Sequence, residues 1–554
     1  MGKIFSANIK VIHGNSQFTI ECEETENILE ALLRQDFYFS TSCGGKGTCG
    51  KCKLQLLEGK LHISTEDRVL LTNQELDNGY RLSCKAYPKE DCTIRIESSD
   101  ESEFEIISDN HSPSDNQSQS DKQSPTDILS PTDKHSTSEY QTKSIYTSGL
   151  ERATEAIEQY YGIAIDIGTT TIVVGLTGMA TKRIQQTFTT INKQRVYGAD
   201  VISRIQASNE GKKNSLQNLI RKDLLEGIKE VVNKAKIDKQ MVRRITIAGN
   251  TTMEHLLLGY SCETMGRFPF TPVDIGTKVI NFKEIFASDY LDIPVTILPV
   301  ISTFVGADIV AGLTFCNFDR NEKICMLIDL GTNGEMAIGN KDRILVSSTA
   351  AGPAFEGGNI SCGVGSIAGA ICNLSIENNI LHYQTINDQS PIGLCGTGVI
   401  EITSELLKSG FIDSTGLLVR EYFESGYEVV SSIIKFTQKD IREIQLAKAA
   451  VRAGIEILIN SYGTSYQQLD TVYLAGGFGY KINIEKAIHI GLLPKELSGK
   501  IKVIGNSSLA GTVQYLTEKD TIDRMEKIIK VSEEINLSNE KGFNELYVDY
   551  MDFY

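Results

Sequence analysis

Residues 42–52 read Ser42-Cys43-Gly44-Gly45-Lys46-Gly47-Thr48-Cys49-Gly50-Lys51-Cys52, and a fourth cysteine, Cys84, follows 32 residues after Cys52. Glycine has no Cβ and readily takes left-handed backbone conformations, so a loop of this composition can fold tightly. We therefore expect the loop and Cys84 to wrap four thiolates around one compact inorganic centre. The glycines expected to be left-handed, with their backbone N–H groups close to that centre, are Gly44, Gly45, Gly47 and Gly50.

The spacing of these cysteines favours a 2Fe-2S cluster over a zinc ion. Such a cluster takes four thiolates, and one common pattern has gaps of four and then two residues before a distant fourth cysteine. Here five residues separate Cys43 from Cys49, and two separate Cys49 from Cys52. The alternatives are a zinc site, which usually has two Cys-x-x-Cys pairs, or buried thiols. Because the chain has only one such pair, we predict that Cys43, Cys49, Cys52 and Cys84 bind iron.

Composition narrows the class of protein further. A chain of 554 residues should fold into more than one domain. Its 71 acidic against 55 basic residues, a net charge of -16, argue against a nucleic-acid-binding surface. Twelve cysteines with a third of them in one cluster motif are typical of a reducing compartment, so we expect a cytoplasmic protein. No apolar run approaches the length of a membrane span, and no membrane association is expected.

The pattern around the cysteine loop is that of a small mixed α+β domain. Alternating residues predict a hairpin over 8–22 with a turn at Gly14, and helical spacing predicts a helix over 28–33. Strands are predicted at 53–56 and 93–96. This order of hairpin, helix, cysteine loop and strands resembles the β-grasp fold of 2Fe-2S ferredoxins. We expect this domain to span residues 1–100.

Residues 101–158 have a different composition. Ser, Asp, Gln, Thr and Lys dominate, and Ser-Pro-x-Asp recurs at Ser112, Ser124 and Ser130. Such a segment cannot bury enough apolar surface to offset the entropy lost on ordering, so we predict a flexible, disordered linker. An insertion with no role beyond connection is the alternative. The last domain is then expected to span residues 159–554.

Two similar motifs occur in this last domain. Asp166-x-Gly168-Thr169 and Asp329-x-Gly331-Thr332 lie 163 residues apart, and each is predicted to sit on a tight turn between two strands. The repeat indicates a weak internal duplication with two facing halves. An aspartate in one such turn alone is most often a turn-forming residue, which is the simpler interpretation of each motif taken singly.

A third motif, Gly476-Gly477, follows an apolar strand and precedes a helix predicted over 483–492. The three motifs in this order resemble the phosphate and adenosine motifs of the actin-like (ASKHA) superfamily, which includes sugar kinases. The resemblance implies a two-lobed α/β ATPase domain with ATP bound in the cleft. The nucleotide-binding residues that it implies are Gly168, Thr169, Thr170, Gly331, Thr332, Asn333, Gly476 and Gly477.

The same resemblance implies catalytic groups. Asp166 and Asp329 would hold a hydrated Mg²⁺ ion, and Asp329 and Glu335 are candidates to activate the attacking water. The glycine-rich stretch 352–358 could line the nucleotide, but turns explain it equally well.

The whole arrangement, a 2Fe-2S domain with a five-residue first gap ahead of an actin-like ATPase domain, resembles the ATP-dependent reductive activators of corrinoid proteins. Stretches 163–171, 250–259 and 327–335 also look like this family. The resemblance implies reduction of Co(II) to Co(I) in a corrinoid protein, with a reduced ferredoxin or flavoprotein as electron donor, and a homodimer. Two other functions stay open: a redox-sensing ATP-binding regulator, and a small-molecule kinase with an accessory ferredoxin domain.

Overall fold

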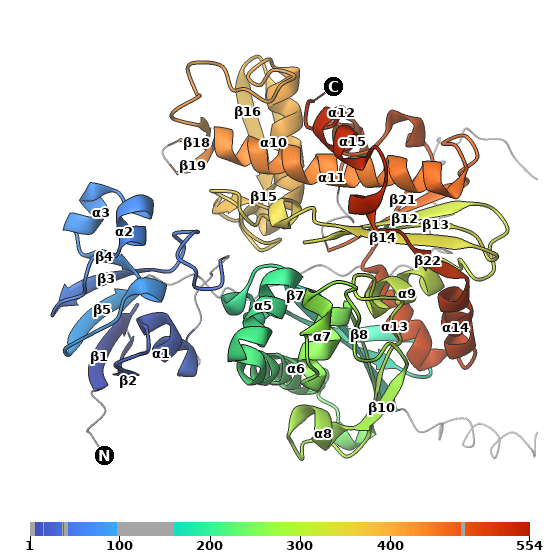
Figure 1. Cartoon of the computed structure of the whole chain (residues 1–554), viewed down its shortest axis with the longest axis horizontal. Helices are drawn as coiled ribbons and strands as arrows, with labels where there is room; N and C mark the ends of the chain where they lie inside the picture. The colour runs from blue at the N-terminus through green and yellow to red at the C-terminus, as the bar shows by residue number, and fades with distance from the viewer. Residues whose placement is uncertain are drawn as a thin grey trace, which may run out of the picture.

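The computed structural model describes residues 6–14, 16–35, 37, 43–96, 160–431, 433–477 and 482–553. It contains a small N-terminal domain beside a larger body of two lobes (Figure 1). The predicted linker over 101–158 lies outside the described residues. Among the residues that are described, no helix is long and apolar enough to cross a membrane.

The N-terminal domain is a five-stranded mixed sheet with the order β2-β1-β5-β3-β4. The predicted hairpin is confirmed, with a left-handed Gly14 in its turn, and β1 also pairs in parallel with β5. The predicted helix is confirmed as α1, which buries Ile28, Leu29, Ala31 and Leu32 in the core. These elements are β1 (Ser6–His13), β2 (Ser16–Glu23), α1 (Ile28–Arg34), β3 (Lys53–Glu58), α2 (Thr65–Leu70), α3 (Asn73–Asp77), β4 (Tyr80–Leu82) and β5 (Cys92–Ile96).

The first lobe is built on a six-stranded sheet with the order β10-β11-β9-β6-β7-β8. Its strands are β6 (Tyr161–Ile167), β7 (Thr171–Gly178), β8 (Arg183–Ile191), β9 (Val242–Gly249), β10 (Lys278–Asn281) and β11 (Pro294–Ile297). Its helices are α5 (Val201–Ala207), α6 (Lys213–Ala235), α7 (Thr251–Leu258) and α8 (Phe282–Phe286). The aliphatic faces of β6, β7, β9 and β11 and of α6 form one core.

The second lobe repeats this plan on a sheet with the order β21-β20-β12-β13-β14-β22. Its strands are β12 (Cys325–Leu330), β13 (Gly334–Gly339), β14 (Ile344–Thr349), β20 (Thr471–Ala475), β21 (Ile501–Gly505) and β22 (Ser532–Glu534). Smaller sheets hold β15 (Ala370–Glu377), β16 (Ile380–Thr385), β17 (Gly393–Leu394), β18 (Tyr427–Val430) and β19 (Ile434–Phe436). Its helices are α10 (Gly396–Lys408), α11 (Gln438–Tyr462), α12 (Ile484–His489) and α15 (Phe543–Asp549).

The predicted internal duplication is visible in the topology. In each lobe an antiparallel meander, β6-β7-β8 or β12-β13-β14, pairs through its first strand with a parallel strand, β9 or β20. The turns that carry the two Asp-x-Gly-Thr motifs therefore occupy equivalent places in the two sheets.

Three helices lie where the lobes meet: α9 (Ala307–Phe315), α13 (Ser507–Thr517) and α14 (Thr521–Val531). Helix α13 follows β21 of the second lobe but packs on β6 and β9 of the first lobe, and it crosses α9. The crossing is tight, because a Cβ on Gly511 would lie 2.0 Å from the carbonyl oxygen of Ala311 and one on Gly312 would lie 2.7 Å from Ser507 Oγ. Gly511 thus lets the backbones of the two helices meet at the junction of the lobes, and Gly312 leaves room for the side chain of Ser507.

Candidate functional site

The four predicted iron ligands gather at one end of the N-terminal domain. Cys52 and Cys84 are buried with their sulfurs 3.3 Å apart, and the half-buried Cys43 contacts the thiol of Cys49. Within the described residues no three His, Cys, Asp or Glu side chains are placed to hold a single metal ion. Two cysteine pairs are what a two-iron cluster needs, since each iron takes two thiolates. The arrangement in two pairs matches this requirement.

The loop backbone has the predicted conformation. Gly44, Gly45, Gly47 and Gly50 have φ of 57°, 78°, 79° and 68°, in the left-handed region. This turns backbone N–H groups toward the ligands. Contact with the Cys49 thiol, helped by N–H groups of Gly47, Thr48 and Cys49, lowers the pKa of Cys43 to about 4.

In the second cysteine pair, hydrogen bonds again lower the pKa of one of the two thiols. The Cys84 thiol, its backbone N–H and the Ser83 hydroxyl lower the pKa of Cys52 to about 7, while Cys84, the thiol that shares the proton, has a raised pKa. Thiolates are the form that binds iron, and hydrogen bonds from N–H groups to them tune the potential of a cluster. The donor set and its hydrogen bonds fit the predicted group.

The two phosphate-type turns meet between the lobes. The turn between β6 and β7 carries Gly168, Thr169 and Thr170, and the turn between β12 and β13 carries Gly331, Thr332 and Asn333. The hydroxyl oxygens of Thr170 and Thr332 are 2.8 Å apart, although the two residues come from different lobes. The sequence motifs are thus brought together at one point.

Glu356 joins the two turns. Its Oε2 accepts hydrogen bonds from the hydroxyls of Thr170, at 2.9 Å, and Thr332, at 2.5 Å. Burial raises the pKa of this carboxyl group, and the two hydroxyls oppose the shift. Glu356 ends the short turn Pro353–Glu356 within the glycine-rich stretch that the sequence left undecided. The contacts favour the interpretation that this stretch lines the site.

The acidic residues predicted from the motifs lie close to one another. Burial, together with Asp308, Asp166 and Glu356, raises the pKa of Asp329 to about 8. Glu335 at the start of β13 has its pKa raised by burial and by Asp308 and Asp329, and its side chain is hydrogen-bonded to Asn333. A cluster of carboxyl groups of this kind attracts a cation or a cation-bound phosphate.

Asp308 is an acidic residue of this cluster that sequence reasoning missed. It lies in the first turn of α9, where its Oδ1 accepts a hydrogen bond from the backbone N–H of Ile309 at 2.8 Å. Burial and the charge of Asp166 raise the pKa of Asp308 to about 7. The signal available was one aspartate at the start of an otherwise apolar helix, which is also an ordinary helix N-terminus.

Asp166 accepts hydrogen bonds from two residues of the second lobe that its motif does not predict. Its two carboxylate oxygens accept hydrogen bonds from Asn506 Nδ2 and Ser508 Oγ, both at 2.7 Å. Asn506 caps α13, so Asp166 connects β6 to the helix that crosses between the lobes. Burial raises the pKa of Asp166, and these two donors oppose the shift. A change at Asp166 would be felt by α13 directly.

The glycines of the predicted adenosine motif differ from each other. Gly476 has φ of 116°, and a Cβ there would lie 2.2 Å from the carbonyl oxygen of Leu330, so it lets β20 approach the end of β12. A Cβ on Gly477 would have no atom within 4 Å. Gly477 therefore leaves bare backbone beside open space, as a flat base or a ribose requires.

Comparisons with known proteins agree with this geometry. Three family descriptions match the chain: a 2Fe-2S iron-sulfur cluster binding domain over residues 11–89, the RACo middle region over 161–321, and the C-terminal ASKHA domain of RACo over 323–554. The corrinoid activation enzyme RamQ of Eubacterium limosum is 30% identical over 563 residues, which cover 91% of this chain and 92% of RamQ. This chain belongs to the RACo family of corrinoid-protein activators.

Other members of the family extend the comparison. A Co(II) methylated amine-specific corrinoid protein reductase of Methanosarcina barkeri is 28% identical, with 70% of this chain and 76% of the relative covered. A solved structure of a reductive activator for a corrinoid, iron-sulfur protein aligns over 98% of both chains with 28% identity and a TM-score of 0.67. The predicted resemblance to this family is confirmed, and so are the 2Fe-2S domain and an ASKHA domain, which implies ATP as the nucleotide.

Proposed function

We propose that this protein reactivates a corrinoid protein by giving one electron to Co(II), which forms Co(I), in a step that depends on ATP. The observation that carries the proposal is the presence in one chain of the paired cluster cysteines and of the cleft where Thr170, Thr332 and Glu356 meet. The first feature supplies a one-electron carrier. The second supplies a site whose two halves a nucleotide can draw together or separate.

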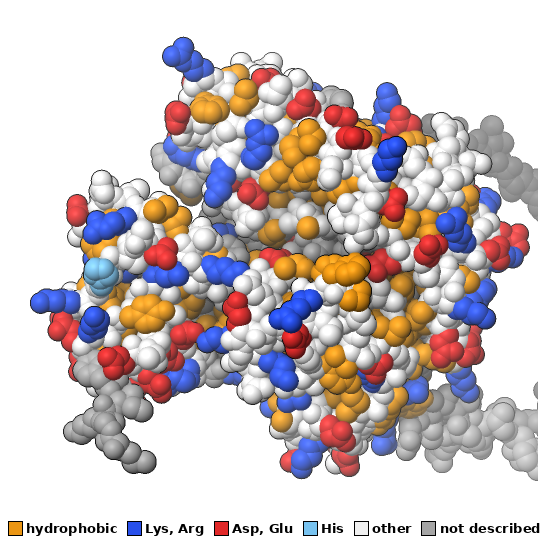
Figure 2. Space-filling view, viewed as in Figure 1, with side chains coloured by type: hydrophobic (Ala, Val, Ile, Leu, Met, Phe, Trp, Pro, Cys, Tyr) orange, Lys and Arg blue, Asp and Glu red, His pale blue; other side chains and the backbone are white. Residues whose placement is uncertain are grey.

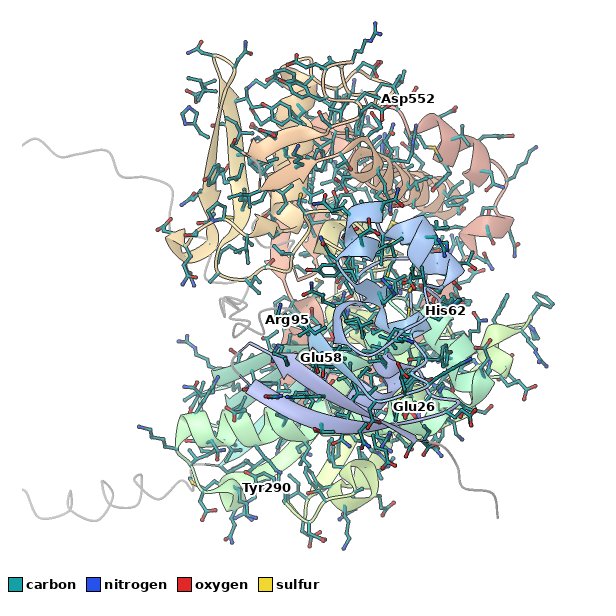
Figure 3. The ribbon with its side chains drawn as sticks, turned by 90° about the vertical axis from the view of Figure 1, so that its left-hand side faces the viewer. Glu26, Glu58, His62, Arg95, Tyr290 and Asp552 are labelled. Atoms are coloured by element: carbon teal, nitrogen blue, oxygen red, sulfur yellow. The ribbon has the colours of Figure 1, made fainter. Side chains whose placement is uncertain are left out.

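The four cysteines would hold the cluster, which supplies one-electron transfer when bound. Their two pairs and the N–H groups of residues 47–49 fix the ligand geometry. A reduced ferredoxin or flavoprotein would be the electron donor. Figure 3 shows the N-terminal domain in front of both lobes, so its outer surface faces away from them and is open to such a donor. Since its thiols must stay reduced, we place the protein in the cytoplasm.

ATP, with Mg²⁺, would bind between the lobes. The hydroxyls of Thr169, Thr170 and Thr332 would face the phosphates, and the Asp329 carboxylate would bind Mg²⁺ through its water shell, as Mg²⁺ prefers. Asp166, Asp308 and Glu335 would add to the negative field that holds the ion. Glu356 lies where the two turns meet, so it could orient the attacking water together with Glu335.

ATP can favour an uphill electron transfer only if it binds two conformations of the protein with different affinity. The lobes supply those conformations, because the contacts that join Thr170 and Thr332 through Glu356 must change when phosphates enter. We keep the division into residues 1–100, 101–158 and 159–554 as part of this proposal. It is supported by the matched ranges 11–89, 161–321 and 323–554.

The decisive experiment is anaerobic. The chemically reduced protein is mixed with a Co(II) corrinoid protein from the same cell, with and without MgATP, and the Co(I) absorbance is followed. We expect Co(I) to accumulate only with MgATP, and the Asp329→Ala variant to be inactive with an intact cluster spectrum. Formation of Co(I) at the same rate without ATP, or phosphate transfer to a small molecule, would contradict the proposal.

A further inference from the structure

The N-terminal domain rests on one particular segment of the first lobe. Lys212 Nζ forms an ion pair with Glu30 Oε1 at 2.8 Å, and Lys46 Nζ donates a hydrogen bond to Gln206 Oε1 at 3.0 Å. Gly44 lies so close that a Cβ there would be 2.5 Å from the carbonyl oxygen of Tyr197. We call residues 192–212 the docking segment. Figure 1 shows the cluster loop reaching toward α5, which lies within it.

This contact is polar and partly solvated. The side chains of Lys212 and Glu30 are 43% and 32% exposed. Figure 2 shows basic and acidic side chains along the seam between the N-terminal domain and the lobes. Ion pairs exposed to this degree contribute little to stability, so the contact can form and break. Partly polar interfaces of this kind between domains of one chain usually permit relative motion.

The docking segment is also attached to the phosphate-type turn. Asn192 donates from its backbone N–H to Thr170 O at 2.8 Å and from Nδ2 to Gly168 O at 3.0 Å. Arg204, which is fully buried, donates from Nη2 to Thr169 O at 2.5 Å and from Nε to Gly198 O at 2.9 Å. These bonds are shielded from water, so a displacement of the turn is passed to the segment that holds the cluster loop.

Arg195 is a half-buried cation inside the docking segment. The charges of Glu356, at the meeting point of the turns, and of Cys49, in the cluster loop, both favour its charged form, while burial lowers its pKa. Burial lowers the pKa of Lys51 in the cluster loop, and the charges of Lys439 and Asp440 at the start of α11 add smaller, opposing effects. Figure 1 shows that the cluster-loop side of the N-terminal domain is turned toward the two lobes.

We propose that residues 192–212 are a docking site for the chain's own ferredoxin domain, and that nucleotide phosphates at Gly168–Thr170 release this domain. Phosphates would bind at the turn whose carbonyl oxygens accept the hydrogen bonds of Asn192 and Arg204. They would displace this turn. Release exposes the face of the cluster loop that docking covers, and a partner protein can then reach it. The nucleotide part of this inference rests on the proposed function.

Zero-length carbodiimide coupling of the Glu30 carboxyl to the Lys212 amine tests the docking in the full-length, cluster-loaded protein. Peptide mass spectrometry quantifies the cross-link with and without a non-hydrolysable ATP analogue and Mg²⁺. We expect the nucleotide to lower the yield by about threefold or more, as a shift between two populated states would. The Lys53–Glu75 pair, 2.5 Å apart within the ferredoxin domain, is the internal control, whose yield should stay constant.

Variants separate docking from general damage. Lys212→Glu places like charges together and should increase hydrogen exchange of residues 193–197, whereas Lys213→Glu makes the same change in charge at the next position and should not. Asn192→Ala removes the hydrogen bond from Nδ2 to Gly168 O and should weaken the response of the cross-link yield to nucleotide. Hydrogen exchange and the cross-link are read without any corrinoid partner.

The outcomes are distinct. Absence of the Glu30–Lys212 cross-link from the cluster-loaded protein would overturn the docking site. Bound nucleotide, confirmed by calorimetry on the same sample, with an unchanged cross-link yield would overturn the coupling alone. Failure of the nucleotide to bind would overturn both the coupling and the ATP dependence of the proposed function.

Discussion

The cluster loop draws its ligands from Cys43 to Cys84 within one small domain, whereas the nucleotide cleft draws its groups from segments between Asp166 and Ser508 in both lobes. The first site is fixed by local backbone conformation, as the left-handed glycines show. The second exists only where the two lobes meet, and a glutamate between two threonines closes it. A locally built site is read easily from sequence and changes little with domain motion. A site built across a junction can respond to what binds there.

The largest effect that we expect from this comparison is loss of the cluster from the N-terminal domain. Replacing Cys52 with Ser removes a buried ligand from the second cysteine pair, so we expect loss of the cluster and of all Co(I) formation. Iron content and the visible spectrum provide the measurement. ATP turnover should persist, because the cleft draws nothing from this domain's core.

The matched control is Cys92→Ser, which alters another buried cysteine of the same domain, on β5. If Cys92→Ser lost the cluster and Cys52→Ser kept it, the assignment of the ligands would be wrong.

The next effect concerns the junction site. Asp329→Ala removes a carboxylate from the acidic cluster, so we expect ATP turnover to fall by about 1,000-fold, as the loss of several kcal/mol of charge stabilisation at a metal site implies. The cluster spectrum should be unchanged. Phosphate release measures the effect, and normal turnover in this variant would refute a role for Asp329 in holding the metal.

A smaller effect is expected at Glu356. Glu356→Gln keeps the shape and an acceptor for the hydroxyls of Thr170 and Thr332 but removes the negative charge, so we expect turnover to fall by about 100-fold, in the range for a proton-transfer or water-orienting group. Nucleotide affinity should change little, which single-turnover and binding measurements would separate. A variant with full turnover would make Glu356 only a structural connection between the lobes.

The change with the least effect on activity concerns the pH dependence of stability. It involves Asp223, which holds the start of the docking segment. Asp223 on α6 is buried and accepts a hydrogen bond from the Lys193 N–H at 3.0 Å, and burial raises its pKa to about 6. Because its folded pKa exceeds its unfolded value of about 3.9, the folded state holds a proton that the unfolded state has lost between these pH values. This residue's contribution to the free energy of unfolding therefore falls as pH rises from about 4 to about 6 and is constant above.

Thermal melts of the wild type and Asp223→Asn would measure this contribution. The stability of the wild type relative to the variant should decline by about 3 kcal/mol across that window. A difference that stays flat with pH would show that Asp223 titrates at its ordinary value.

The contrast between a locally built site and a site built across two lobes also explains how much of each could be predicted from the sequence. The four cysteines, the left-handed glycines, the hairpin and α1 lie where the sequence predicts, because each depends on neighbours close in the chain. Asp166, Asp329 and Glu335 were also predicted, since ordered motifs carried them, and they lie together. Their individual catalytic roles stay predictions.

The groups that were missed are those whose partners are distant. Asp308 begins an apolar helix, and only the fold brings it near Asp329. Asn506 and Ser508 look like an ordinary helix start, yet they hold Asp166 across 340 residues of sequence or more. Glu356 had an equally good explanation as part of a turn. Pairings of this range have no signature in the local pattern of a single chain.

The crossing of α9 and α13 would serve as a hinge between the two lobes. Helices that interlock through large side-chain ridges resist rotation. Here Gly511 faces the backbone of Ala311, and Gly312 faces the small side chain of Ser507. When a lobe rotates about such a contact, atoms at the contact move least and atoms at the outer edge of the lobe move most. A small opening at the threonine turns would therefore become a larger displacement at the outer edges of the lobes, and the N-terminal domain lies beside both of them.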